Sequence, residues 1–179
     1  MTPFDEPFLF DASPLLHAAK ADRLDVLGDL VRGHDCLTTQ SVLDEVRRND
    51  PDAHAVVVLA PWVRTVPTDS LEFLRRFGTW STRMSLKDDH NIGETMLCAY
   101  ADLQGGTLVI DDRDARKVAK RYGLVVCGTM RLIADACVRG DLTLPGASSL
   151  ADTLLESGMR LPFARGGFEA WARRENLLG

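Results

Sequence analysis

The chain has 179 residues, 45% of them hydrophobic, with a formal net charge of −5 and a sequence pI near 5.3. This length and apolar content predict one compact domain, residues 1–179. The acidic balance argues against a protein that coats nucleic acid nonspecifically, because such proteins carry a positive surplus. The start, MTPFDEPFLF, lacks the pattern of a signal peptide, and no apolar run is long enough to span a bilayer. We therefore expect a cytoplasmic protein without membrane contact.

Cysteine and histidine spacing indicates no zinc site. The four cysteines are far apart and lie within apolar stretches, without the close pairs that zinc requires. We expect reduced thiols in the core at Cys36, Cys98, Cys127 and Cys137. The four histidines form no helical pair either, and we assign them no chemistry.

The first predicted elements are a strand and two helices. Residues 7–10 form a short apolar run that predicts a strand, and DASPLLHAAK predicts the helix that follows it. Ser13 can cap the free amides of that helix, and Pro14 fits the first turn, where its missing donor costs nothing. The segment RLDVLGDLV predicts a second short helix directly afterwards.

The next part of the chain gives weaker strand patterns. Strands are expected at 35–39 and 63–66, and Thr38 or Thr39 is expected to begin the helix QSVLDEVRR between them. The stretch 49–90 is the least regular, with helical patterns in PDAHAVVVLAPW and SLEFLRRFGTW. We interpret it as a helical insertion.

The second half returns to a regular alternation. Strands are predicted at 107–110 and 124–127, with Asp114 starting the helix ARKVAKRY between them and Thr129 starting MRLIADACVRG. Residues 145–179 contain two amphipathic helical pieces and are interpreted as a docked C-terminal extension. The alternation of strands and helices predicts an α/β fold with a mostly parallel sheet.

Acidic residues follow two of the predicted strands. Asp11 ends the first strand, and the pair Asp111 and Asp112 ends the run TLVI. Parallel strands deliver their carboxyl ends to one edge of the sheet, so these acids are expected to lie close together. The alternative is that each is an ordinary turn or cap residue.

Two predicted helices carry further candidate acids. Helical spacing places Glu45 at the flank of a buried face, although a surface glutamate would fit the same position. Glu94 lies in the first turn of NIGETMLCAYADL, a helix with almost no polar stripe. It is expected to face a crowded environment that requires a partner, unless it only complements the helix dipole.

These acids together suggest a metal site. Carboxylates that converge at one edge repel one another, and a hard divalent cation removes that repulsion. Sites rich in carboxylate oxygen suit Mg²⁺ or Mn²⁺. We therefore predict that the acids bind one of these ions.

Five segments, in this order, resemble the PIN-domain ribonuclease superfamily, and in particular the VapC-like toxins of bacterial toxin–antitoxin pairs. The matching segments are FLFDASPLL, VLDEV, GETMLCAYA, LVIDDRDARKVAKRYGL and CGTMRLIADACVRG. The resemblance covers residues 7–48 and 91–144, whereas 49–90 and the C-terminal tail match loosely. It implies a three-layer α/β/α fold around a central, mostly parallel sheet.

The resemblance implies a catalytic site made of Asp11, Glu45, Glu94 and Asp112, with Mg²⁺ or Mn²⁺ as cofactor. Asp11 and Asp112 would bind the metal directly, and Glu45 and Glu94 would bind it through water or hold a second ion.

One acid of the family's site matches two candidate residues in this chain. The family's late acid usually follows a threonine or serine and one variable residue, which selects Asp112. Here Ile110 replaces that hydroxyl, and Asp111 competes as the metal ligand. Asn91 stands where part of the family has another aspartate, which predicts a less charged site.

The implied reaction is metal-dependent hydrolysis of RNA that leaves a 5′-phosphate and a 3′-hydroxyl. Ser13, Thr129 and Arg113 are the candidate substrate-binding residues, and Arg113 is the basic residue we favour for phosphate. The other candidate phosphate contacts, which helical position alone does not separate from solvated side chains, are Arg47, Arg48, Arg116, Lys117, Lys120 and Arg121. Three tryptophans could stack on bases but fit the core equally well: Trp62, Trp80 and Trp171.

The resemblance also implies partners, namely a cognate antitoxin protein and a second copy of the chain in a homodimer. The alternative function is a catalytically inert PIN-like module that binds RNA or a protein partner. The presence of all these acids favours the enzyme, because a site that has lost catalytic activity has no physical reason to keep clustered negative charge.

Overall fold

The computed structural model describes residues 6–85 and 91–178, and its centre is a five-stranded sheet. The strand order is β3-β2-β1-β4-β5, and every neighbouring pair is parallel. The strands are β1 (Phe8–Phe10), β2 (Cys36–Thr38), β3 (Val63–Thr65), β4 (Thr107–Val109) and β5 (Val126–Cys127). All five coincide with predicted strands, although each is shorter than predicted. The predicted α/β class with a parallel sheet is confirmed.

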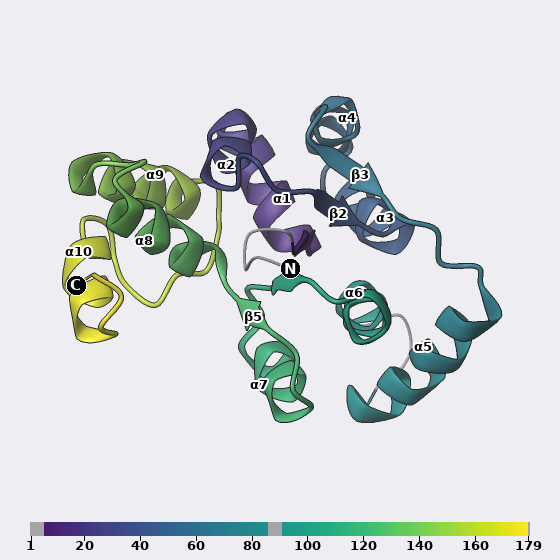
Figure 1. Ribbon diagram of the computed structural model, residues 1–179. Helices are drawn as coiled ribbons and strands as arrows, with labels where there is room; N and C mark the ends of the chain where they lie inside the picture. The colour runs from purple at the N-terminus through teal and green to yellow at the C-terminus, as the bar shows by residue number, and fades with distance from the viewer. Residues whose placement is uncertain (1–5, 86–90, 179) are drawn as a thin grey trace.

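Helices cover both faces of this sheet. They are α1 (Ala12–Lys20), α2 (Leu24–Leu30), α3 (Gln40–Asn49), α4 (Pro51–Leu59), α5 (Leu71–Arg83), α6 (Ile92–Gln104), α7 (Arg113–Arg121), α8 (Thr129–Arg139), α9 (Leu144–Glu156) and α10 (Phe168–Arg174). In Figure 1, α1, α2 and α4 lie above the sheet, and α5, α6 and α7 lie below it. The fold therefore has three layers, α/β/α. In the described part of the chain, no helix combines the length and apolar character needed to cross a bilayer.

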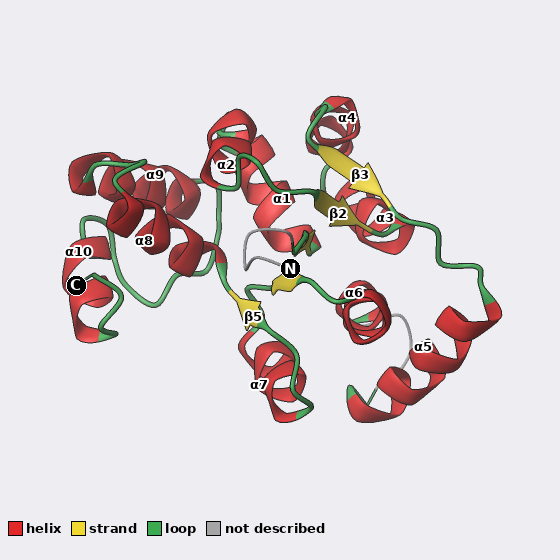
Figure 2. Ribbon diagram, viewed as in Figure 1, coloured by secondary structure: helices red, strands yellow, loops and turns green. Residues whose placement is uncertain are grey.

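The short strands form the centre of the core. Figure 2 shows how the helices enclose them. Leu9 and Phe10 of β1, and Leu108 and Val109 of β4, are fully buried. Strands of a parallel sheet covered on both faces are apolar along their whole length, which explains why these runs do not alternate with polar residues.

Within the stretch 49–90, the described residues up to 85 contribute to all three layers. The strand β3 pairs with β2, with Cys36 opposite Val63. The helix α4 packs against α1 and α3, and α5 packs against α6. This segment, expected to be a helical insertion, thus supplies the edge strand of the sheet and a helix on each side.

The C-terminal residues form the expected helices, α9 and α10, at the β5 end of the sheet (Figure 1). The helix α9 packs on α8, and α10 packs on α9. Trp171 lies 5.3 Å from the ring of Phe163 and 6.1 Å from that of Phe168. One cluster of buried side chains runs from Leu9 to Ala172, so these helices share the core of the sheet.

Two of the predicted helix starts differ from the structure. Thr39 begins α3 as predicted, and its hydroxyl accepts a hydrogen bond from the amide of Val42 at 3.4 Å. Ser13 does not cap α1, because β1 ends at Phe10 and the helix already begins at Ala12. The N-cap is Asp11, whose side chain makes no capping hydrogen bond.

The start of α7 also lies earlier than predicted. Asp112, not Asp114, is the N-cap, and its Oδ1 accepts a hydrogen bond from the amide of Ala115 at 2.7 Å. Asp112, two residues closer to the strand than Asp114, is the cap because the chain turns directly from β4 into the helix. The helix α8 begins at Thr129, with Gly128 as its N-cap.

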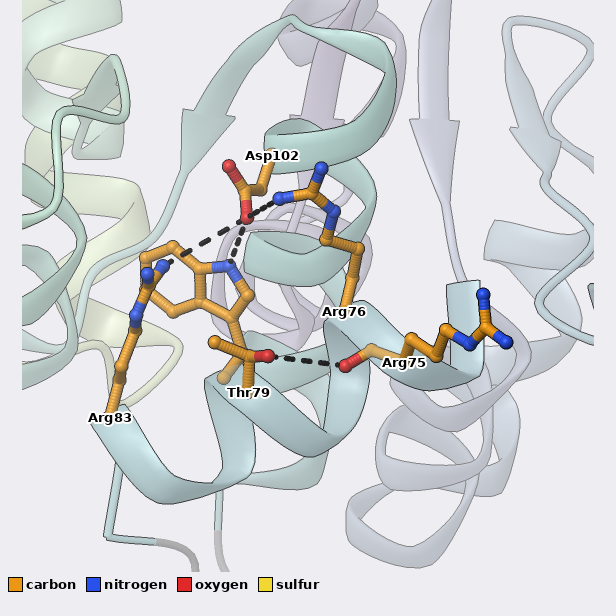
Figure 3. Close-up of polar contacts among 6 residues, drawn as sticks. Arg75, Arg76, Thr79, Arg83 and Asp102 are labelled. Carbon is orange, nitrogen blue, oxygen red and sulfur yellow. Dashed lines mark hydrogen bonds and ion pairs between the residues drawn. The ribbon is translucent and has the colours of Figure 1, made fainter. Parts of the chain in front are cut away.

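A polar joint around Asp102 fastens α5 to α6 (Figure 3). Its Oδ2 accepts hydrogen bonds from the indole Nε1 of Trp80 at 3.1 Å and from Arg76 at 3.2 Å. The guanidinium of Arg83 lies 3.9 Å from the same carboxylate, 4.8 Å from the Trp80 ring and 4.3 Å from the ring of Tyr122. Trp80 is therefore a fully buried core residue that holds the outermost helix in place.

We predict that Asp102→Ala lowers the free energy of unfolding by about 1–3 kcal/mol, because the buried indole donor loses its acceptor. Asp135→Ala is the matched control, since Asp135 forms an exposed pair with Arg131 on α8. Its loss is expected to cost less than about 0.5 kcal/mol. Urea denaturation measures both values, and equal effects would contradict this role of Asp102.

Candidate functional site

The centre of the candidate site is Asp11, at the carboxyl end of β1. Its amide donates a hydrogen bond to the carbonyl of Val109 at 3.1 Å, which fixes the end of β1 against β4. Only 4% of Asp11 is exposed. Its Oδ1 is buried and accepts no hydrogen bond from the residues that the structure describes. A buried carboxylate in this state is costly, so the position favours a ligand that can bind the oxygen.

Gly93 brings the helices α3 and α6 together beside Asp11. A Cβ atom at this position would lie 3.3 Å from Oε2 of Glu45 and 3.5 Å from Oδ1 of Asp11. These two oxygens are therefore no further apart than the sum of those distances. The same Cβ atom at position 93 would also lie 3.1 Å from Cγ2 of Val42. Glycine thus keeps a small space open between two carboxylates that come from different elements.

Glu94 is the next residue on α6 and is 8% exposed. The prediction that it faces a crowded environment is confirmed. Most of the first part of α6 is covered, because Gly93, Thr95, Leu97 and Cys98 are also buried.

The carboxylate of Asp11 interacts electrostatically with three other carboxylates. Burial raises the pKa of Asp11 well above its ordinary value, and the charges of Glu94, Glu45 and Asp111 raise it further. The backbone amide of Ala12 acts in the opposite direction. We call Asp11, Glu45, Glu94 and Asp111 the acidic cluster. The sequence predicted that these four acids converge together with Asp112, and in the structure the charges of Glu94, Glu45 and Asp111 all act on Asp11.

Asp111 is the member of the adjacent pair that joins this cluster. Its Oδ1 accepts a hydrogen bond from the amide of Thr129 at 2.8 Å, and its Oδ2 accepts one from the Thr129 hydroxyl at 2.8 Å. Burial raises the pKa of Asp111, while the two Thr129 hydrogen bonds and the charge of Arg116 lower it. Thr129 therefore orients a carboxylate of the site.

Asp112 points elsewhere. It is exposed, and its carboxylate caps α7 through the amide of Ala115. The charges that act on the carboxylate of Asp11 include that of Asp111 but not that of Asp112. The resemblance selected Asp112 as the direct ligand, whereas the electrostatic effect on Asp11 comes from Asp111 and the carboxylate of Asp112 serves as a helix cap.

Arg116 is the basic residue next to the cluster. Its Nη1 donates hydrogen bonds to the carbonyls of Ile110 at 2.9 Å and Asp111 at 2.6 Å. A Cβ atom on Gly128 would lie 3.0 Å from Oδ1 of Asp111 and 3.1 Å from Nη1 of Arg116. Arg116 thus braces the loop that carries Asp111, and glycine at 128 leaves room for both groups.

The predicted substrate contacts fall into different environments. Ser13 is half-buried in the first turn of α1, two residues after Asp11, whereas Arg113 is exposed at the start of α7. Trp62 is half-buried, with its ring 5.5 Å from that of Phe10 and directly over Gly28. The sequence analysis missed Gly93 and Gly128, and it named Arg116 only as one of several candidate phosphate contacts, not as a residue that braces the Asp111 loop. A glycine in the first turn of an otherwise covered helix was the available signal for Gly93.

A cavity of about 610 Å³ lies away from the acidic cluster. Its lining includes His34 and Cys36, at the start of β2, and Pro61 and Trp62, just before β3. These residues mark the amino ends of the strands, whereas Asp11 follows a carboxyl end. The cavity and the cluster are therefore separate features at opposite edges of the sheet.

The acidic cluster fits a hydrated divalent cation better than a fully protein-enclosed one. Within residues 6–85 and 91–178, no three carboxylate, histidine or thiol side chains are close enough to form a ready coordination shell. Mg²⁺ keeps several waters and commonly takes one or two protein carboxylates. The unbonded oxygen of Asp11 supplies one such ligand, and its neighbours supply the negative charge that a cation would neutralise.

The raised pKa of Asp11 predicts a pH-dependent stability. The folded protein binds the Asp11 proton more tightly than the unfolded chain, so this carboxyl lowers the free energy of unfolding as pH rises from about 4 through its folded-state pKa. In EDTA, Asp11→Asn should therefore be more stable than the wild type at pH 7. This advantage should disappear near pH 3, where Asp11 is protonated in both states.

Thermal denaturation of both proteins at the two pH values measures this difference. Asp112→Asn is the control, and it should follow the wild type at both pH values because its side chain is exposed. A wild type that is more stable than Asp11→Asn at pH 7 in EDTA would contradict the repulsion between these acids.

Comparison with known proteins gives one match. A family model described as a PIN domain matches residues 7–165, which includes all five strands, the acidic cluster and α9. No curated protein and no solved structure matches the chain. Because the match covers most of the sequence, the chain belongs to the PIN-domain family.

Proposed function

We propose that this protein is a metal-dependent endoribonuclease that hydrolyses RNA phosphodiester bonds with Mg²⁺ or Mn²⁺. PIN domains are typically metal-dependent nucleases, and this chain belongs to that family. The observation that carries the proposal is the buried Asp11 oxygen without a hydrogen bond, surrounded by the charges of Glu45, Glu94 and Asp111. An apolar core gains nothing from such a group, whereas a nuclease needs it.

In this proposal, Asp11 and Asp111 hold the cation, with Glu94 contributing directly or through water. A bound divalent cation lowers the pKa of a coordinated water and neutralises charge on the phosphate oxygens. Thr129 donates a hydrogen bond to each oxygen of Asp111 and so fixes the orientation of this carboxylate. Glu45, which is less buried than Asp11 and Glu94, would accept a proton from the attacking water.

The arrangement also explains why a metal mechanism suits these residues. Hydrolysis that breaks the bond between phosphorus and the 3′ oxygen would leave a 5′-phosphate and a 3′-hydroxyl, and a bound cation would supply the activated water. Such a reaction requires neither a histidine base nor a serine nucleophile. Arg116 offsets part of the negative charge from the Asp111 side of the cluster.

The biological role we propose is that of the toxin in a toxin–antitoxin pair, acting in the cytoplasm. It rests on the resemblance to VapC-like toxins. The implied partners are a cognate antitoxin and a second copy of the chain. Large apolar side chains on α4 and α5 offer surface for such partners, since Leu59 is 82% exposed and Leu71 is 65% exposed.

The second candidate function is a PIN-like module that binds RNA or protein without catalysis. The absence of a ready three-ligand group among the described residues favours this candidate. It predicts that Mg²⁺ or Mn²⁺ neither raises the melting temperature nor supports cleavage.

Cleavage by the two neighbouring aspartate variants tests the proposal. Asp111→Asn should reduce the rate of cleavage of single-stranded RNA by at least about 100-fold, because losing a metal ligand costs several kcal/mol of transition-state stabilisation. Asp112→Asn should stay within about threefold of the wild type, since asparagine caps a helix as well as aspartate does.

A gel assay with a labelled RNA in Mn²⁺ gives both rates, and Asp11→Asn serves as the inactive reference. Full activity of Asp111→Asn together with loss of activity in Asp112→Asn would contradict the assignment. Absence of cleavage by the wild type would favour the non-catalytic module.

A further inference from the structure

The outer face of α7 carries a row of basic side chains. Arg113, Lys117, Lys120 and Arg121 are all exposed. A helix turns by about 100° per residue, so these four positions fall within an arc of about 100°. Ala115 and Ala119 are buried on the other side of the helix. We call these four residues the α7 basic face.

Three of the four cations on this face form no ion pair with the acidic side chains that the structure describes. More than half of the lysines and arginines in the described ranges form an ion pair with an acidic side chain. On α7, Lys117 pairs with Asp114 at 2.9 Å, but Arg113, Lys120 and Arg121 take part in none of these ion pairs. In a chain with a net charge of −5, a local surplus of this kind marks a surface for an anionic partner.

The position of α7 connects this surface to the acidic cluster. The helix starts one residue after its cap Asp112, and thus two residues after Asp111. Arg113 is therefore at the end of the face nearest to the cluster, and Arg121 lies about 12 Å further along the axis. In Figure 1, α7 lies on the outside of the fold next to β5 and below the sheet.

We propose that the α7 basic face binds the sugar–phosphate backbone of single-stranded RNA and guides it toward the acidic cluster. This inference rests on the proposed nuclease function. Lysine and arginine contacts to phosphate position a nucleic acid without reading its sequence. Asp11 is buried beside α3 and α6, a place that a single flexible backbone reaches more easily than a rigid double helix.

The face also compensates for the repulsion between substrate and site. Four carboxylates repel a phosphate until a cation is bound, so binding energy must come from elsewhere on the surface. Contacts along α7 supply this energy away from the reacting phosphate, and they release counterions as they form. They should therefore affect RNA affinity and its salt dependence more than the rate of the chemical step.

The test compares two triple variants that change the net charge equally. Lys117→Gln, Lys120→Gln and Arg121→Gln together remove three cations from α7 but leave Arg113 in place. The matched control combines Arg160→Gln, Arg173→Gln and Arg174→Gln, which removes three exposed cations near the C-terminus. The probe is a fluorescein-labelled oligouridylate of about 15 nucleotides, and its anisotropy is followed in EDTA so that cleavage cannot occur.

Each phosphate contact to a single strand contributes about −0.7 to the slope of log affinity against log salt. Loss of three contacts should make the slope about 2 units less negative and weaken binding by on the order of 100-fold at 0.1 M salt. The control should bind like the wild type. The proposal is overturned if the α7 variant keeps the wild-type slope and affinity, if the control loses as much affinity, or if the wild type binds no RNA.

Separate cleavage assays in Mn²⁺ distinguish this inference from the nuclease proposal. At saturating RNA, the α7 variant should retain the wild-type kcat and show a raised KM. Cleavage by the wild type with unchanged RNA affinity in the variant overturns the role of the face but leaves the nuclease intact. If RNA binding depends on α7 but the wild type cleaves no RNA, the role of the α7 basic face stands and the nuclease proposal is overturned.

Discussion

The site depends on one costly feature, a carboxylate placed inside the fold at the end of the central strand. Asp11 is held there by β1, whose residues Leu9 and Phe10 are fully buried, and by the hydrogen bond of its amide to Val109. Its pKa is raised by burial and by three neighbouring acids. The stability of the surrounding core must offset this cost, because within the described ranges no basic side chain forms an ion pair with Asp11. Asp11 is therefore both the least favourable buried group of the site and the residue on which the proposed chemistry depends.

The packing around Asp11 is arranged so that the acids approach without filling the space between them. Gly93 allows α6 to pass close to α3, and Gly128 allows Asp111 and Arg116 to lie next to the start of α8. A methyl group at either glycine would touch a carboxylate oxygen of the site. The Asp102 joint acts further out, because it fixes α5 against α6, the helix that carries Glu94. Packing in three layers thus contributes directly to the geometry of the cluster.

Much of this architecture could be predicted from the sequence. Apolar runs predicted all five strands, and the rule that parallel strands end at one edge placed Asp11 and Asp111 at the carboxyl ends of two strands that are neighbours in the sheet. Helical spacing was enough to identify Glu94 as buried, because nearly every other residue around it is apolar.

Finer distinctions depended on contacts that a sequence does not contain. Adjacent residues at a strand end point in different directions, so the choice between Asp111 and Asp112 depends on where the turn into α7 begins. The structure starts that helix at Arg113, which uses Asp112 as the cap and leaves Asp111 for the cluster. Arg116 looked like any other cation of a basic helix, and only the tertiary fold turns it back onto the strand end.

The proposed chemistry requires a divalent cation at the buried oxygen of Asp11. Anomalous diffraction from crystals grown with Mn²⁺ can locate this ion. We expect a peak about 2.1 Å from Oδ1 of Asp11, with Asp111 or Glu94 as a further direct or water-mediated ligand. A protein saturated with Mn²⁺ whose anomalous peaks lie away from Asp11 would contradict the proposed chemistry.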